Sequence, residues 1–315
     1  MRTRTLGTNG PVISEIGLGA WAIGGPWQFG WGAVDDEESI RTIRRALDLG
    51  VNWIDTAAVY GLGHSEEVVA RAVAGRRGEA LVATKCGLVW DGSGQVRRCS
   101  RPDSIRREAE ASLRRLRTPV IDLYQIHWPD PEVPVAESWG AMVRLREEGK
   151  VRWIGVSNYS LEEIQACHAI HPVQSLQPQY SLLRRAIESD LLPWCGKAGV
   201  GIVAHSPMAS GLLTGSFDKG RLAPDDWRRE GKFFQEPVFS KALELVERLR
   251  PMAARHGKTV GQVAVAWVLR RPEVTAAIVG ARRPDQVDVN VLASGWWLSL
   301  AELAQIDRHL AELGL

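Results

Sequence analysis

The chain has 315 residues, and its 39 Lys and Arg residues nearly balance its 37 Asp and Glu residues, for a net charge of +2. Because these charges are spread along the chain rather than gathered in a block, neither a nucleic acid nor a membrane surface is expected as a partner. The four cysteines form no C-x-x-C pair, no apolar stretch is long enough to cross a bilayer, and no export signal opens the sequence, so we expect a soluble protein of the reducing cytoplasm.

Eight short apolar runs, separated by longer amphipathic segments, follow an N-terminal stretch of turn-forming residues. Runs dense in Val, Ile and Leu are typical of parallel strands buried on both faces, and such strands need helical crossovers. Eight repeats of this unit favour an α/β fold, a single-domain (β/α)₈ TIM barrel over residues 1–315, rather than an open doubly wound sheet. The predicted strands cover residues 15–20, 51–57, 80–87, 120–128, 151–158, 173–179, 201–207 and 275–281.

The amphipathic segments predict helices between the strands, and an extra C-terminal helix follows the last unit. Ser100 and Ser160 suit N-cap positions, and Pro102 suits a first helical turn. Residues 206–239 break the rhythm with Gly, Pro, Trp and mixed charge, so they form either a functional loop or a mobile one. The predicted helices cover residues 36–49, 65–75, 103–117, 135–148, 160–169, 187–198, 259–270, 284–293 and 299–312.

Reactive side chains follow three consecutive predicted strands. Asp55 ends the second strand, Lys85 ends the third, and His127 ends the fourth, while Tyr60 follows shortly after Asp55. In a barrel of this kind the active site lies at the C-terminal ends of the strands, so we expect all four side chains in one pocket.

The chemistry of these four groups suggests a proton-transfer site. Tyrosine exchanges protons poorly near neutral pH, and a neighbouring Lys85 ammonium favours the phenolate of Tyr60. Asp55 is placed to neutralise Lys85, and His127 is placed to hydrogen-bond a substrate oxygen, in a protonation state that the sequence leaves open. A tyrosine that gives a proton to an oxygen suits the reduction of a carbonyl, and since no side chain delivers hydride, a nicotinamide cofactor is implied.

Eight motifs run in order along almost the whole chain: GLGAW, DTAAVYG, ATK, IDLYQIHWPD, GKVRWIGVSNY, QPQYSLL, AHSPMASGLLTG and VGARRPDQVDVN. Together they resemble the aldo-keto reductase superfamily, in its bacterial branch. The resemblance implies a (β/α)₈ barrel with an N-terminal β-hairpin closing its bottom, and NAD(P)H-dependent reduction of aldehydes or ketones. It also implies that Asp55, Tyr60, Lys85 and His127 form the catalytic tetrad, with Tyr60 as the proton donor.

The resemblance further implies a site for NADPH, with NADH as an alternative. Ser157, Asn158 and Gln179 are expected to hydrogen-bond the nicotinamide carboxamide, and Tyr180 is expected to stack on the nicotinamide ring. The other implied cofactor contacts are Gly19, Ala20, Trp21 and Asp55 near the nicotinamide, and Ser206, Pro207, Met208, Gly211 and Leu212 under the pyrophosphate.

The adenosine end of the cofactor is assigned by the resemblance to Gly280, Arg282, Gln286 and Asn290. An arginine beside a helix N-terminus suits a 2′-phosphate, which favours NADPH. Gly280 and Gln286 stand where another branch of the family carries cations, and this weakens strict dependence on NADPH.

Tryptophans in the predicted loops indicate an aromatic pocket for a small carbonyl or sugar-like substrate. A second hypothesis keeps the barrel but makes it a slow-turnover NADP(H)-sensing regulatory subunit. No metal site is expected because the seven histidines are scattered, and monomer and homo-oligomer both stay open. The predicted substrate-binding residues are Trp21, Trp27, Trp31, Tyr60, Trp90, His127 and Trp128.

Overall fold

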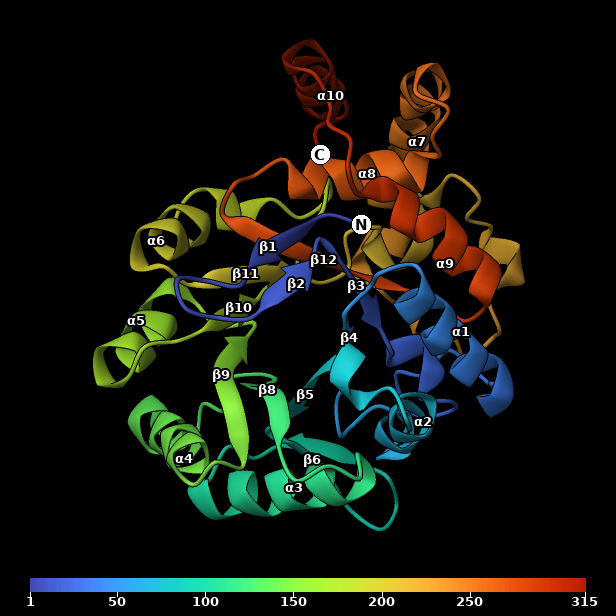
Figure 1. Cartoon of the computed structure of the whole chain (residues 1–315). Coiled ribbons are helices and arrows are strands. Elements are labelled where there is room, and N and C mark those ends of the chain that lie inside the picture. Colours follow the sequence, from blue (N-terminus) through green and yellow to red (C-terminus); the bar gives the residue numbers. More distant parts are fainter.

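The computed structural model describes the backbone of residues 1–315 and every side chain except that of Arg221. Eight parallel strands form a closed barrel surrounded by helices, which confirms the predicted (β/α)₈ fold (Figure 1). Each strand overlaps one of the eight predicted runs. The barrel strands, in their order around the ring, are β3 (Ile16–Gly19), β4 (Trp53–Asp55), β5 (Leu81–Cys86), β8 (Ile121–Ile126), β9 (Val151–Ser157), β10 (Ser175–Gln177), β11 (Gly201–Ala204) and β12 (Val274–Gly280).

An N-terminal hairpin closes the bottom of the barrel, as expected. Its strands β1 (Thr3–Thr5) and β2 (Val12–Ser14) pair antiparallel. Leu6 and Ile13 from this hairpin are buried in one apolar cluster with Trp53 of β4. Gly17 on β3 allows this packing, because a Cβ there would lie 2.1 Å from the indole ring of Trp53. The barrel floor is therefore a packed apolar layer.

Ten α-helices form in the described chain, and nine of them correspond to predicted ones, although α6 covers only the last eight of its twelve predicted residues. The short 3₁₀ turn η3 (Ala186–Glu188) takes part of the first half. The helices are α1 (Asp36–Asp48), α2 (His64–Ala72), α3 (Pro102–Arg115), α4 (Val135–Glu147), α5 (Leu161–Ile170), α6 (Leu191–Ala198), α7 (Val238–Arg255), α8 (Val260–Leu269), α9 (Pro284–Asn290) and α10 (Leu300–Leu313).

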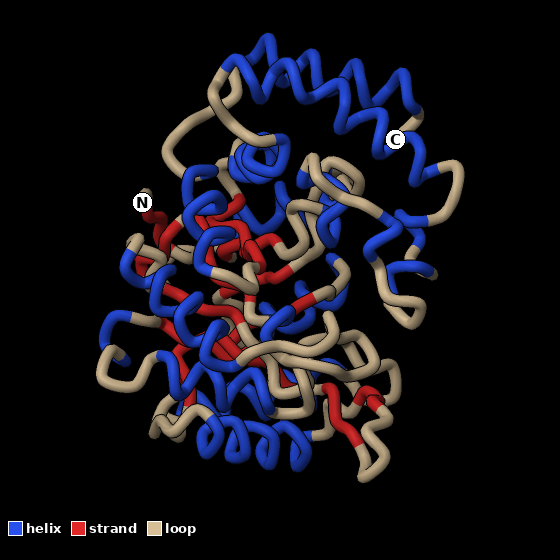
Figure 2. Tube along the Cα trace, turned by 90° about the vertical axis from the view of Figure 1, so that its right-hand side faces the viewer, coloured by secondary structure: helices blue, strands red, loops and turns tan.

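Helix α7 is the one long helix that the sequence analysis missed. Its buried residues Ala242, Leu245 and Leu249 recur at helical spacing, so the local signal was present. The helix begins inside the irregular segment 206–239 and contains Pro251. A proline inside a segment argues against the prediction of a helix there. In the structure α7 packs against α10, and the two helices lie beyond the ring around the barrel (Figure 2).

The predicted helix starts are partly confirmed. Ser160 caps α5 through a reciprocal capping box with Glu163, and Pro102 lies in the first turn of α3. The N-cap assigned to Ser100 is wrong, because Arg101 occupies that position of α3 and its side chain makes no capping hydrogen bond. The backbone N–H of Ser100 instead donates to the carboxylate of Asp130.

Segment 206–239 folds into four short 3₁₀ turns beside the C-terminal ends of the strands. They are η4 (Ala209–Thr214), η5 (Lys219–Arg221), η6 (Trp227–Arg229) and η7 (Lys232–Phe234). Trp227 stacks on Trp21 with ring centroids 5.2 Å apart, and this contact joins the segment to the loop after β3. A second unpredicted feature is the hairpin of β6 (Leu88–Trp90) and β7 (Val96–Arg98).

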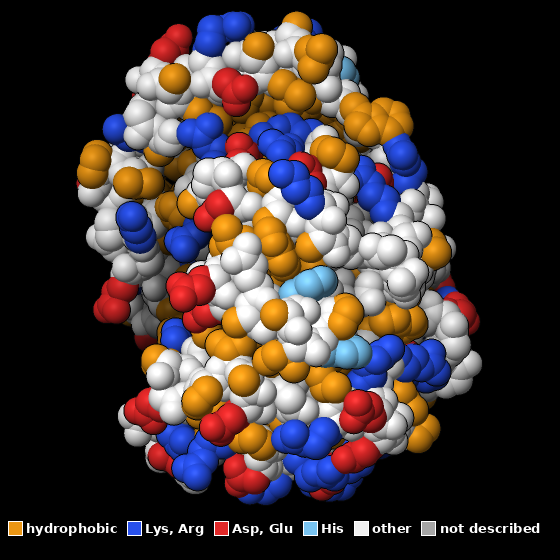
Figure 3. Space-filling model, turned by 90° about the vertical axis from the view of Figure 1, so that its left-hand side faces the viewer, with side chains coloured by type: hydrophobic (Ala, Val, Ile, Leu, Met, Phe, Trp, Pro, Cys, Tyr) orange, Lys and Arg blue, Asp and Glu red, His pale blue; other side chains and the backbone are white. Residues whose placement is uncertain are grey.

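The surface reflects the near balance of charges. On the face shown in Figure 3, basic and acidic side chains are intermixed. Among the described residues, no helix combines the length and the hydropathy that a membrane span requires.

Candidate active site

The C-terminal ends of β4, β5 and β8 bring the four predicted catalytic side chains together. The Lys85 ammonium donates to Asp55 Oδ1 at 2.6 Å and to the Tyr60 hydroxyl oxygen at 3.2 Å. The ring of His127 meets the ring of Tyr60 edge to face, with centroids 5.7 Å apart. Residues that lie far apart in sequence therefore form one cluster, centred on the Tyr60 hydroxyl.

Lys85 is a buried cation with a buried counter-ion. Its side chain is fully buried and that of Asp55 is 4% exposed. Burial alone would lower the pKa of Lys85, but Asp55 and Tyr60 oppose this effect and the pKa is raised. The backbone carbonyl of Thr56 accepts a further hydrogen bond from the ammonium at 2.9 Å. Lys85 therefore stays charged beside Tyr60.

Tyr60 holds its own proton at neutral pH. Burial raises the pKa of its phenol, whereas the Lys85 ammonium lowers it. Lys85 acts in the direction expected from the sequence, but burial outweighs it, so the prevailing form is the phenol and not the phenolate. A neutral phenol next to an ammonium can release a proton to an acceptor and leave a phenolate that the cation stabilises.

His127 is neutral, which answers the question that the sequence left open. Burial lowers its pKa well below the ordinary histidine value, and the nearby charge of Lys85 lowers it further. A neutral imidazole can hydrogen-bond an oxygen without adding a second positive charge beside Lys85.

A second histidine, His205 at the end of β11, belongs to the same mouth, although the sequence analysis gave it no role. Both N–H groups of the Asn158 amide are used, by the His127 carbonyl oxygen and by Ser157 Oγ. Asn158 Oδ1 is therefore an acceptor, and His205 Nε2, 3.1 Å away, must carry a proton. His205 Nδ1 is left to accept from the Ser206 hydroxyl at 3.1 Å.

The free energy of unfolding is expected to fall as the pH drops below about 6.5, the ordinary histidine pKa, because the native state resists protonation of His205. Burial, with Lys85 and Arg184, lowers the pKa of His205 to about 3. The stabilisation is complete above the unfolded pKa and is lost as the pH falls toward the folded one. Between pH 6.5 and 5 the loss reaches about 2 kcal/mol. Urea unfolding at both pH values should show a flatter dependence in His205→Gln, and equal slopes in the two proteins would contradict this assignment.

One residue of the predicted nicotinamide site is placed differently from the expectation. Tyr180 is fully buried away from the mouth: its hydroxyl bonds with Glu188 and Arg270, and its ring packs against Trp267. The prediction that Tyr180 stacks on a nicotinamide ring is therefore wrong. Gln179 forms an isolated β-bridge with His205.

Gln177 is the glutamine that reaches the cluster of Asp55, Lys85 and Tyr60, and the sequence analysis missed it. Its Nε2 donates to Asp55 Oδ2 at 2.7 Å. The alternation of side chains along β10 could have identified it, because residues two apart on a strand share one face, as Ser175 and Gln177 do. In the structure Ser175 also points into the barrel, where it contacts Gln125.

Aromatic side chains surround Tyr60 at the mouth. The rings of Trp21 and Trp27 each lie 6.3 Å from the Tyr60 ring, and Trp90 of the β6–β7 hairpin packs in the same cluster. Trp128 is not among the described members of that cluster, because it is 38% exposed and lies under the guanidinium of Arg98. These positions leave an apolar wall on one side of the Tyr60 hydroxyl.

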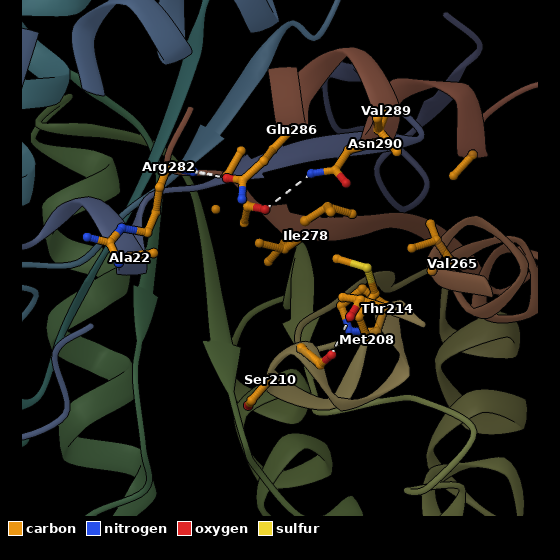
Figure 4. A pocket seen from close by; sticks show the side chains of 18 of the residues that line it. Ala22, Met208, Ser210, Thr214, Val265, Ile278, Arg282, Gln286, Val289 and Asn290 are labelled. Carbon is orange, nitrogen blue, oxygen red and sulfur yellow. Dashed lines mark hydrogen bonds between the residues drawn. The ribbon is translucent and has the colours of Figure 1, made fainter. Parts of the chain in front are cut away.

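A cavity of about 430 Å³ extends from the mouth toward α9 (Figure 4). Ala20 and Leu212, which the sequence placed among the cofactor contacts, are fully buried in the core and are not among its lining residues. Trp31, predicted as a substrate contact, lines this cavity. The predicted cofactor residues that line it are Gly19, Trp21, Ser206, Pro207, Met208, Gly211, Gly280, Arg282, Gln286 and Asn290.

The backbone beside this cavity suits an anionic ligand such as a dinucleotide pyrophosphate. Ser206, Ala209 and Ser210 have φ values of 55°, 49° and 55°, which are uncommon for residues with a Cβ. Gly211 follows with φ 98°. The N–H groups of Ala209 and Gly211 donate to the carbonyls of Ser206 and Met208 within the turn. An anion would therefore meet the other backbone N–H groups of this concave turn. Among the described residues, no group of His, Cys, Asp and Glu is placed to hold a metal ion.

The family model described as Aldo/keto reductase family matches residues 15–311 of this chain. The chain is 40% identical over 314 residues to aldo-keto reductase YhdN of Bacillus subtilis, which covers 98% of this chain and 94% of that protein. It is 36% identical over 327 residues to the NADH-specific methylglyoxal reductase of Escherichia coli, covering 99% of each chain.

Two solved structures share this architecture. The glycerol dehydrogenase AKR11B4 from Gluconobacter oxydans superposes with a TM-score of 0.90 at 43% identity, covering 98% of this chain and 95% of that one. An aldo/keto reductase from Klebsiella pneumoniae in complex with NADP and acetate has a TM-score of 0.76 at 31% identity, covering 98% and 95%.

Proposed function

Because this chain belongs to the aldo/keto reductase family, we propose that Tyr60 is the proton donor when it reduces a carbonyl compound to an alcohol. As a member of that family the chain is an NAD(P)H-dependent carbonyl oxidoreductase. The observation that carries the assignment of Tyr60 is the contact between its hydroxyl and the Lys85 ammonium, 3.2 Å long, at the mouth of the barrel.

The roles of the four side chains follow from their charges. Tyr60 gives its proton to the carbonyl oxygen as the alcohol forms, and Lys85 stabilises the phenolate that is left. Asp55 keeps Lys85 charged and in place. Neutral His127 orients the carbonyl oxygen toward Tyr60. A bound nicotinamide cofactor would supply the hydride.

We propose NADPH as the preferred cofactor, with NADH as an alternative. Gly19 and Trp21 would lie at the nicotinamide end of the cavity, the left-handed turn at Ser210 and Gly211 under the pyrophosphate, and Arg282 at the adenosine end. Ser157 and Asn158, with Gln177 rather than Gln179, would hold the carboxamide. This assignment is supported by the hydrogen bonds that Gln177 donates to Asp55 and Asn158 donates to the carbonyl of His127.

The substrate that the mouth suits best is a small carbonyl compound. Trp21, Trp27 and Trp90 provide apolar surface, while Tyr60 and His127 provide hydrogen bonds for one oxygen. The relatives named for methylglyoxal and glycerol act on compounds of this size. Both are enzymes, so the comparisons lend no support to a slow-turnover NADP(H)-sensing subunit.

Steady-state assays with purified protein test this proposal. NADPH absorbance is expected to fall when methylglyoxal, glyceraldehyde or an aromatic aldehyde is added, and the rate with NADH is expected to be lower. The absence of turnover across a panel of aldehydes and ketones, in protein that binds the cofactor, would overturn the proposal.

A further inference from the structure

Arg282 joins two segments of the cavity rim that lie far apart in sequence. Its backbone N–H donates to Gln286 Oε1 at 2.7 Å, which anchors it at the start of α9. Its side chain reaches the loop after β3, where Nη1 donates to the carbonyl of Trp31 at 3.1 Å and Nη2 donates to that of Ala33 at 2.6 Å. We call residues 24–34 the first loop.

The guanidinium of Arg282 keeps donors for a further partner. Of its five N–H groups, two are used by the first loop, and no other acceptor among the described residues is recorded for its side chain. Arg282 also lines the cavity, together with Gln286 and Asn290, and Figure 4 shows its side chain extending from the Gln286 end toward Ala22. One edge of the guanidinium therefore holds the loop while donors remain for a ligand in the cavity.

The neighbouring Arg283 differs in each of these respects. Its guanidinium pairs with Asp285 through Nε and Nη2, and no contact with the first loop is recorded for it. Arg283 is also not among the described residues that line the cavity. The two adjacent arginines therefore form a matched pair, of which only Arg282 touches both the cavity and the loop.

The first loop is connected in turn to the catalytic tyrosine. The ring of Trp31 meets that of Trp21 edge to face at 5.6 Å, and the ring of Trp21 stacks over that of Tyr60 at 6.3 Å. A contact that restrains Trp31 therefore also restrains the aromatic wall beside Tyr60.

We propose that Arg282 couples the adenosine end of the cofactor to the substrate wall: a phosphomonoester on the adenosine ribose binds the free donors of Arg282 and thereby fixes the first loop through Trp31 and Ala33. This inference rests on the proposed nicotinamide cofactor, and it goes beyond cofactor preference. A long arginine side chain loses rotamer freedom when its second edge is bound, so its bonds to the loop persist for more of the time. Arg282 is then a positioning residue for the substrate wall, and a 2′-phosphate orders that wall whereas a cofactor without one does not.

Hydrogen–deuterium exchange of the first loop tests the coupling without any turnover. The two probes are adenosine 2′,5′-bisphosphate and adenosine 5′-monophosphate, which differ by the 2′-phosphate and lack the nicotinamide; each is used at a saturating concentration. The bisphosphate is expected to slow exchange in residues 27–34 by about five-fold or more relative to the monophosphate. The difference is expected to vanish in Arg282→Met and to persist in the matched control Arg283→Met.

Equal protection by the two probes in the wild-type protein would overturn the coupling, and this comparison stands even if Arg282→Met does not fold. Persistence of the difference in a folded Arg282→Met protein would overturn it as well. Because neither probe can deliver hydride, failure of the proposed reductase activity and failure of the coupling are separate results.

Discussion

Replacing Tyr60 by phenylalanine is expected to lower kcat by about 10²- to 10⁴-fold, the usual contribution of a positioned acid or base. The phenol is the proton-bearing group that touches both the Lys85 ammonium and the aromatic wall, and phenylalanine keeps the ring but loses the proton. The dissociation constant for NADPH, measured by fluorescence titration, is expected to change little, because the long cavity near α9 does not include Tyr60.

Tyr124→Phe provides the matched control for this measurement. Tyr124 is a buried tyrosine like Tyr60, with exposed fractions of 0% and 9%, but it belongs to the apolar cluster between β8 and the surrounding helices and not to the mouth. Its variant should keep kcat close to the wild-type value. A Tyr60→Phe protein that retained most of its turnover, with an intact fold by circular dichroism, would remove Tyr60 from the role of proton donor.

Replacing Lys85 by methionine is expected to reduce both turnover and stability. Turnover falls because the phenolate that Tyr60 becomes loses its neighbouring cation. Stability falls because Asp55, 4% exposed, is left as a buried charge without its counter-ion, a change that typically costs about 3–5 kcal/mol. The value of kcat measures the loss of turnover, and the midpoint of urea unfolding measures the loss of stability.

The double variant Lys85→Met/Asp55→Asn separates the two effects of Lys85. Removing the carboxylate charge as well should recover much of the lost stability, since neither member of the pair is then left charged. Turnover should stay low, because Tyr60 still has no cation beside it. Recovery of turnover together with stability would contradict a direct electrostatic action of Lys85 on Tyr60.

The barrel and the grouping of Asp55, Lys85 and His127 could be predicted from the sequence alone. Alternating apolar runs and amphipathic segments are local patterns, and they identified the eight strands within a few residues. Because the C-terminal ends of parallel strands meet at one mouth, Asp55, Lys85 and His127 could be grouped from their places after consecutive runs. The proximity of Tyr60 then followed from its short distance along the chain from Asp55.

The direction and the environment of individual side chains could not be predicted from the sequence, because they depend on the packing of distant segments. Tyr180 and Gln177 lie three residues apart, yet the first packs against Trp267 and the second reaches Asp55. The protonation of Tyr60 depends on the balance between burial and the charge of Lys85, and the link from Arg282 to the first loop joins segments about 250 residues apart. Strand and helix periods are set by neighbours along the chain, whereas solvation, charge and hydrogen-bond partners are set by neighbours in space.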